Sequence, residues 1–119
     1  MNKEQLKERT KQFALRVMTL VDHLPKNSKR RVLGGQLLRS ATSVAANYRA
    51  ACRARSSAEF AAKLGTVLEE VDESALWMEL ISAGGLLKQS LVEGLLAEAN
   101  ELAAIMFSAR RTTQRNANS

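Results

Sequence analysis

The sequence is poor in cysteine, proline and aromatic residues, and each scarcity excludes a class of protein. The single cysteine, Cys52, cannot form an internal disulfide, and no cluster of cysteine and histidine could hold structural zinc. Aromatic residues make up only 4% of the 119 residues, which argues against an all-β sandwich or barrel. No run of about 18 apolar residues occurs, and the first ten residues alternate charges where a signal peptide needs an apolar stretch. We therefore expect a soluble cytoplasmic protein with no membrane partner.

Hydrophobic residues recur every three or four positions in four segments, which predicts amphipathic helices over about 2–24, 28–53, 57–83 and 87–109. Ser28 is a predicted N-cap, and Ser56 with Glu59 forms a predicted capping box in which the Glu59 carboxylate reaches back to the Ser56 amide. Gly84 and Gly85 end the third helix. On the fourth helix the predicted core residues are Leu87, Leu91, Leu95, Leu102, Ile105 and Met106. Long helices joined by short loops predict an all-α, antiparallel up-down four-helix bundle over residues 1–109. Residues 110–119 have almost no apolar content and are predicted to form a flexible, disordered basic tail.

Charge is distributed unevenly along the chain, whose net charge is +6. Residues 23–58 hold eight lysines and arginines and no acid, whereas residues 59–101 hold nine acids and two lysines. On a regular helix, Arg31, Arg39, Arg49 and Arg53 fall within roughly an 80° arc. Arginine grips phosphate with a two-pronged guanidinium, and no aromatic residue interleaves with the stripe, so we expect sequence-independent contact with a nucleic-acid backbone. The candidate nucleic-acid-binding residues are Arg31, Arg39, Arg49, Arg53, Arg55, Arg110 and Arg111. The alternative interpretation of the stripe is a solvated face or a partner for the acidic third helix.

The last two helices carry extra apolar stripes beside their predicted core faces, so their apolar surface is wider than the core of one bundle can bury. We therefore expect self-association. The candidate interface residues are Leu76, Leu80, Val92, Leu96, Ala103 and Phe107. The opposed charges of the second and third helices suit a head-to-tail contact, which closes into a ring when the rotation permits. Small residues at Ser40, Ala41, Ala45 and Ala46 predict a close approach between the second helix and a neighbour.

Residues able to carry catalysis are few. His23 lies at the end of the first helix, where a charged imidazole would favour the helix C-terminus. Cys52 has no adjacent histidine to act as a base, and we interpret it as core filler. No Glu-x-x-His pair is present to build a di-iron site, so we expect no cofactor and no resident metal.

One enzyme hypothesis stays open. The pattern Glu69-Glu70-x-x-Glu73, followed by Glu98-x-x-Glu101, resembles the paired carboxylates with which all-α nucleotide pyrophosphohydrolases hold magnesium. The second motif ends in Glu where that family usually has Asp. Acidic residues at this spacing are also common on solvated helix faces.

An ordered series of segments resembles a bacterial four-helix-bundle family, related to the S23 ribosomal-protein-like products of intervening sequences in 23S ribosomal RNA genes. The segments are QLLRSATSVAANYR (36–49), ARS (54–56), EF (59–60), KL (63–64), LEEVDES (68–74) and WMEL (77–80). The match covers most of residues 6–107. The resemblance implies a cytosolic homopentamer with a basic surface, related to accessory proteins that bind nucleic acid and a reverse transcriptase. It implies no known catalysis. Ala50 stands where the family often has Glu, so any hydrogen bond made by that carboxylate is missing here.

These observations lead to one functional prediction and two alternatives. We expect a non-catalytic, homo-oligomeric helical bundle that binds RNA, or another nucleic acid, through a basic surface in an accessory or scaffold role. The homopentamer and a protein partner such as a reverse transcriptase rest on the resemblance. The alternatives are the magnesium-dependent nucleotide pyrophosphohydrolase and a purely structural scaffold.

Overall fold

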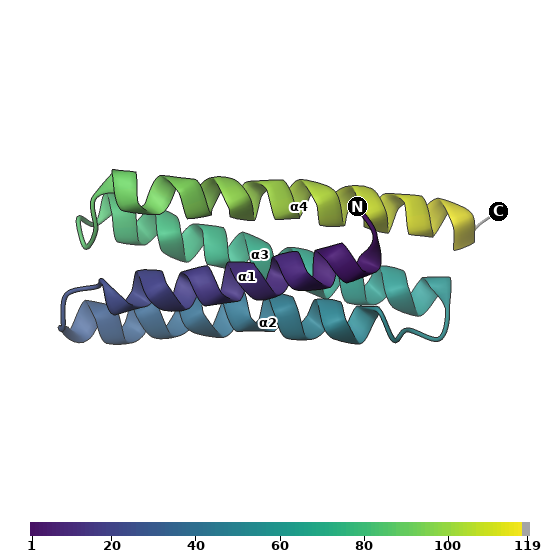
Figure 1. The fold of residues 1–119 in the computed structure, drawn as a ribbon, viewed down its shortest axis with the longest axis horizontal. Helices are drawn as coiled ribbons and strands as arrows, with labels where there is room; N and C mark the ends of the chain where they lie inside the picture. Colours follow the sequence, from purple (N-terminus) through teal and green to yellow (C-terminus); the bar gives the residue numbers. More distant parts are fainter. Residues whose placement is uncertain (118–119) are drawn as a thin grey trace.

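The computed structural model describes residues 1–117, which form four long helices in an antiparallel bundle. The elements are α1 (Lys3–Asp22), a short π-helical turn η1 (Arg30–Gly34), α2 (Gly35–Ala51), α3 (Ser57–Ala83) and α4 (Gln89–Ala117). The α1–α2 turn and the α3–α4 loop lie at the same end of the bundle, while the chain start and the α2–α3 loop lie at the other (Figure 1). The predicted all-α four-helix bundle is confirmed. No helix within residues 1–117 is long and apolar enough to cross a membrane.

The start of α1 is held by a reciprocal capping box. The Asn2 carbonyl Oδ1 accepts the Gln5 amide at 2.8 Å, and the Gln5 side chain accepts the Asn2 amide at 3.0 Å. The two bonds satisfy amides that would otherwise lack partners at the helix start. The helix stops at Asp22, shortly before Pro25, which cannot continue it.

The α1–α2 turn differs from the sequence prediction in its cap and its geometry. Asn27, rather than Ser28, caps the next helix, because its side-chain oxygen accepts the Arg30 amide at 2.9 Å. The chain then passes through the π turn η1 before α2 begins. Gly34 permits this turn to pack on the end of α1, since a Cβ at that position would lie 3.2 Å from Leu24 Cδ1.

Helix α2 packs against α3 through small residues, as the sequence predicts for Ser40 and Ala41, both buried. The Ser40 and Ser74 hydroxyl oxygens lie 2.8 Å apart in this contact. At the start of α3, the Ser56 hydroxyl accepts the Glu59 amide at 3.1 Å. The predicted return bond is wrong in its donor, because the Glu59 carboxylate accepts the amide of Arg55 at 3.1 Å. Gly85, with φ of 76°, closes α3 in the left-handed region that favours glycine.

Residues 110–117 are helical, so the predicted disordered tail is wrong over this range, and residues 118–119 lie outside the described part of the chain. Arg110 explains the extension. Its Nε donates to the Ala61 carbonyl of α3 at 3.1 Å, and its guanidinium lies over Gly65. A Cβ on residue 65 would come within 3.1 Å of Arg110 Nε. A cross-helix hydrogen bond therefore orders a segment whose composition alone indicates disorder.

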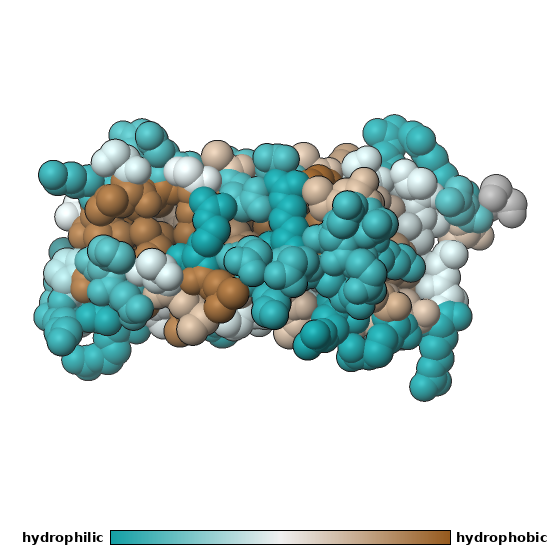
Figure 2. Space-filling view, viewed as in Figure 1, coloured by the Kyte–Doolittle hydropathy of each residue, from teal (hydrophilic) through white to brown (hydrophobic). Residues whose placement is uncertain are grey.

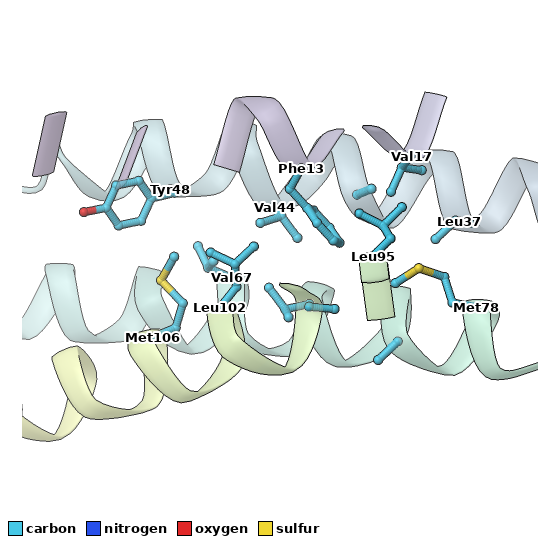
Figure 3. Packing of buried hydrophobic residues seen from close by; sticks show 14 of the residues in the cluster. Phe13, Val17, Leu37, Val44, Tyr48, Val67, Met78, Leu95, Leu102 and Met106 are labelled. Carbon is cyan, nitrogen blue, oxygen red and sulfur yellow. The ribbon is translucent and has the colours of Figure 1, made fainter. Parts of the chain in front are cut away.

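One continuous core runs through the bundle between the four helices (Figure 3). Phe13, Val17, Leu37, Val44 and Met78 are among its fully buried side chains. Each of the first three helices buries the face on which hydrophobic residues recur every three or four positions, as at Leu20 on α1 and at Leu64 and Val71 on α3. On α4 the buried residues are Val92, Leu95, Ala99, Leu102 and Met106. The predicted core residue Leu91 is instead 54% exposed, because the inward face of α4 lies between the two stripes that the sequence distinguishes.

Candidate nucleic-acid interface

The arginines predicted to form one stripe on α2 do not lie in one environment. Arg31, Arg49 and Arg53 are exposed, and none of the three pairs with an acid within residues 1–117. The Arg53 guanidinium donates to the Arg49 carbonyl at 3.4 Å, which keeps it near the end of α2. Arg31 lies within the π turn η1, whereas the other three follow it. Because a π turn closes its hydrogen bonds over one more residue than an α turn, the regular spacing that placed Arg31 on the same arc does not hold through it.

Arg39 is an internal ion-pair residue, which corrects its assignment to the phosphate-binding stripe. Its guanidinium donates to Glu73 at 2.7 Å and to Glu70 at 3.2 Å, both on α3, and to Gln36 at 3.1 Å. The alternative interpretation of the stripe, a partner for the acidic third helix, therefore holds for Arg39 within a single chain. Arg39 divides the basic surface of α2 into two separate parts.

The first part is the end of the bundle that holds the chain start and the α2–α3 loop, where α2 ends and α4 runs past that loop. Arg49, Arg53, Arg55 and Arg111 are all exposed there, and Lys3 lies 4.6 Å from the ring centre of Phe60. Arg110 does not belong to this surface, because it is half-buried and bound to the Ala61 carbonyl. Four of the seven predicted binding residues thus gather at one end of the molecule.

The second part is the α1–α2 turn, where the sequence prediction named only Arg31. Lys26, Lys29 and Arg30 add three more cations within six residues, and none of the four pairs with an acid in the described chain. Hydrophilic side chains cover this lower-left end of the molecule in Figure 2. The sequence does contain the pattern that indicates this cluster, namely several lysines and arginines in succession with no acidic residue among them.

Four of the five carboxylates of the hydrolase hypothesis are engaged by two different arginines, and the fifth, Glu69, is exposed. Arg9 of α1 holds Glu98 through two hydrogen bonds of 2.6 and 2.9 Å and approaches Glu101 at 2.8 Å, both on α4. These bonds lower the pKa of Glu98 below its ordinary value. Glu70 and Glu73 instead pair with Arg39 on the other side of the bundle. No group of three or more histidine, cysteine or acidic side chains within residues 1–117 is arranged to hold a metal ion.

The predicted oligomer interface is divided by the structure. Leu76, Leu80 and Phe107 are exposed by 46%, 42% and 58%, although they are large and apolar. Leu96 and Ala103 are half-buried and pack on the core. Val92, only 1% exposed, belongs to the core of its own chain, which corrects its assignment to the interface. The inward face of α4 takes in Val92 from the extra stripe together with Leu95 and Leu102 from the predicted core.

Further exposed apolar side chains, which the sequence prediction missed, lie on α1 and at the start of α4. Leu15 and Met18 of α1 are 43% and 47% exposed, and Leu91 of α4 is exposed. Figure 2 shows a broad hydrophobic area near the start of α4 and a smaller one below it. These positions fall between the core positions of their helices, and only the direction in which each helix faces its neighbours decides that they are exposed.

The protein is thus an antiparallel four-helix bundle that carries two clusters of cations without acidic partners in the described residues. The sequence model of the 23S rRNA-intervening sequence protein family matches residues 2–108, and the chain belongs to that family. A solved structure of a protein of unknown function from the S23 ribosomal protein family of Bacteroides thetaiotaomicron is also similar. It shares 32% identity and a TM-score of 0.80, over 86% of this chain and 94% of that one. Comparison with curated proteins gave no match.

Proposed function

We propose that this protein is a non-catalytic, homo-oligomeric bundle that binds nucleic acid through its basic surface and serves as an accessory or scaffold factor in the cytoplasm. One observation carries the proposal. Of the eight cations in residues 23–58, only Arg39 forms an ion pair within the described chain. The others remain unpaired although nine acids lie between residues 59 and 101. Unpaired cations grouped on one protein favour an anionic partner.

The chemistry of the exposed groups favours phosphate as that anion. Arg49, Arg53, Arg55 and Arg111 present guanidinium groups, which bind phosphate oxygens in pairs. Phe60, the aromatic residue beside Arg55, is half-buried with Lys3 over its ring and is poorly placed to stack on a base. The proposed contact is therefore with the backbone and depends little on sequence. The family to which the chain belongs is named after an intervening sequence of 23S rRNA, and this association favours RNA over DNA as the partner.

The proposed self-association depends on exposed apolar side chains and on charge. Leu76 and Leu80 lie on α3 among acidic residues, and Phe107 is exposed on α4. A contact between this surface and a basic surface of the next copy is head-to-tail, and such a contact closes into a ring when the rotation between copies permits. The family resemblance favours five copies, and a ring would repeat the basic surface once per subunit.

A double substitution at the end of α2 tests the nucleic-acid proposal. Arg49→Gln with Arg53→Gln should weaken binding to all RNA sequences alike. It should also flatten the log–log salt dependence by about 1.4 units on single strands, at roughly 0.7 per phosphate contact. The matched control is Arg16→Gln with Lys88→Gln, which removes the same charge from two exposed, unpaired cations elsewhere.

The measurement is a fluorescence-anisotropy titration at four salt concentrations, together with the mass of each variant by light scattering. Equal weakening by the test and control variants would show that only net charge matters and would contradict a defined surface. Unchanged binding combined with dissociation into monomers would instead assign these arginines to an acidic neighbour and leave a purely structural scaffold.

A further inference from the structure

The α1–α2 turn encloses an open cleft of about 530 Å³ at one end of the bundle, here called the turn cleft. Its volume falls in the range of small-ligand sites, which is roughly 300–1,000 Å³. Of its lining residues, the cations Lys26, Arg30 and Arg31 are here called the rim, and the nonpolar Val21, Leu38 and Gly35 are called the floor. Asn27, Ser28 and Gly34 complete the lining.

The rim of the turn cleft carries uncompensated positive charge. None of its three cations pairs with an acid within residues 1–117, and no acidic side chain is among the lining residues. The Arg30 stem passes close to Gly34, with Cγ 3.8 Å from the position of a Cβ there, and the residue is half-buried. Arg30 is therefore partly ordered before any ligand arrives, which lowers the entropic cost of binding an anion.

The floor of the turn cleft has a different chemistry. Val21 and Leu38 are half-buried apolar residues, and Gly35 offers bare backbone, since a Cβ added there would meet no atom within 4 Å. A bare phosphate would need only the rim. An apolar floor beside a cationic rim suits a ligand with an anionic end and a flat, weakly polar body.

The π turn η1 contributes three residues to this cleft. Arg30 and Arg31 lie on the rim with Lys26, while Gly34 packs close to Val21 and Leu24, and the following Gly35 faces open space. Single π turns inside helices are rare and often accompany functional sites.

We propose that the turn cleft binds one unpaired nucleoside phosphate unit, with the phosphate at Lys26, Arg30 and Arg31 and the base or ribose on Val21, Leu38 and Gly35. This inference rests on the proposed nucleic-acid function and adds a discrete seat to it. A base-paired nucleotide cannot enter, because its base is stacked within the duplex. The same chemistry is offered by a free nucleotide and by the unpaired end of a strand.

Filling the cleft without changing any charge gives the sharpest test. Gly35→Leu places a side chain into the open space beside the floor, and leucine favours a helix over glycine. The matched control is Gly94→Leu on α4, where a Cβ would lie 3.9 Å from Arg16 and meet no closer atom. Arg30→Gln with Arg31→Gln is a second variant, which removes charge and leaves the cleft open.

The probes are adenosine monophosphate, a single-stranded RNA and a blunt RNA duplex, each titrated by calorimetry or anisotropy. We expect Gly35→Leu to weaken binding of the single strand at least tenfold, while Gly94→Leu matches the parent and duplex affinity changes less than twofold. Parallel loss of adenosine monophosphate binding identifies the free nucleotide as a ligand. Loss confined to the strand identifies the strand end.

Two outcomes would overturn the turn cleft as a nucleotide site. One is parent-like binding of every probe by Gly35→Leu. The other is full retention of single-strand binding by Arg30→Gln with Arg31→Gln. The variant Arg49→Gln with Arg53→Gln separates the two proposals. If it binds RNA as well as the parent, the proposed backbone-binding surface is contradicted, whereas the turn cleft is unchanged in this variant and is judged by its own variants. Melting curves of all variants confirm that each is folded.

Discussion

Arg9→Met should lower the free energy of unfolding by about 2–3 kcal/mol, because charge-assisted hydrogen bonds contribute about 1.5–3 kcal/mol each and are not additive. Arg9 joins the first helix to the last through two bonds to Glu98, at 2.6 and 2.9 Å. The Arg9 and Glu98 side chains are only 21% and 16% exposed, so removing the cation leaves a poorly solvated carboxylate. The melting temperature should fall by about 10 °C for a chain of this size.

A double-mutant cycle isolates the pair itself. With Arg9→Met, Glu98→Gln and their combination, we expect a coupling energy of about 1.5–2.5 kcal/mol at neutral pH. The matched control is Lys7 with Glu4, an ion pair of 2.7 Å in which Glu4 is 81% exposed. Its coupling should not exceed about 0.5 kcal/mol. Urea unfolding followed by circular dichroism measures both cycles, at one protein concentration because self-association shifts apparent stability.

The pH dependence gives the cycle a second readout. Arg9 lowers the pKa of Glu98 in the folded chain below its ordinary value of 4.5, so the carboxylate stabilises the fold above that pH. The coupling should persist at pH 5 and disappear as the pH falls through the lowered folded value. A coupling no larger than that of Lys7 with Glu4, or one that is unchanged at pH 2, would refute the reasoning.

Three further predictions concern assembly, catalysis and packing. Leu80→Asp should reduce the assembled mass in light scattering without lowering helix content, because this side chain is 42% exposed on one chain, and an unchanged mass would exclude Leu80 from the interface. The purified protein should leave nucleoside triphosphates intact in magnesium or manganese, and turnover that is lost in Glu70→Gln and Glu98→Gln would instead establish the hydrolase. Trp77→Phe should leave the free energy of unfolding unchanged or raise it by up to about 1 kcal/mol, since the buried indole Nε1 has no hydrogen-bond partner; a loss above about 1 kcal/mol in urea unfolding would contradict this.

The positions and inward faces of α1, α2 and α3 are predictable from the sequence because they follow from local order. Phe13, Val17, Leu37 and Val71 recur at helical spacing, and a helix has one face on which such residues can stack. Asn2 and Gln5 show a limit within this local reasoning. Their reciprocal cap depends only on neighbouring residues and fits the capping-box pattern, yet the predicted caps are Ser28 and Ser56, of which only the Ser56 hydroxyl cap forms.

The helical class, most of the core and the overall separation of basic from acidic segments are readable from residue types and their spacing along one chain. Which charges remain free depends instead on how the helices pack against one another. Arg39 and Arg110 both lie in basic segments of the sequence. In the structure, however, Arg39 pairs with Glu70 and Glu73, and Arg110 lies over Gly65 and donates to the Ala61 carbonyl. The turn cleft likewise depends on a π turn that packs Gly34 on α1. Such contacts join residues dozens of positions apart, and the way the helices pack together, rather than the period of any one helix, brings them within bonding distance.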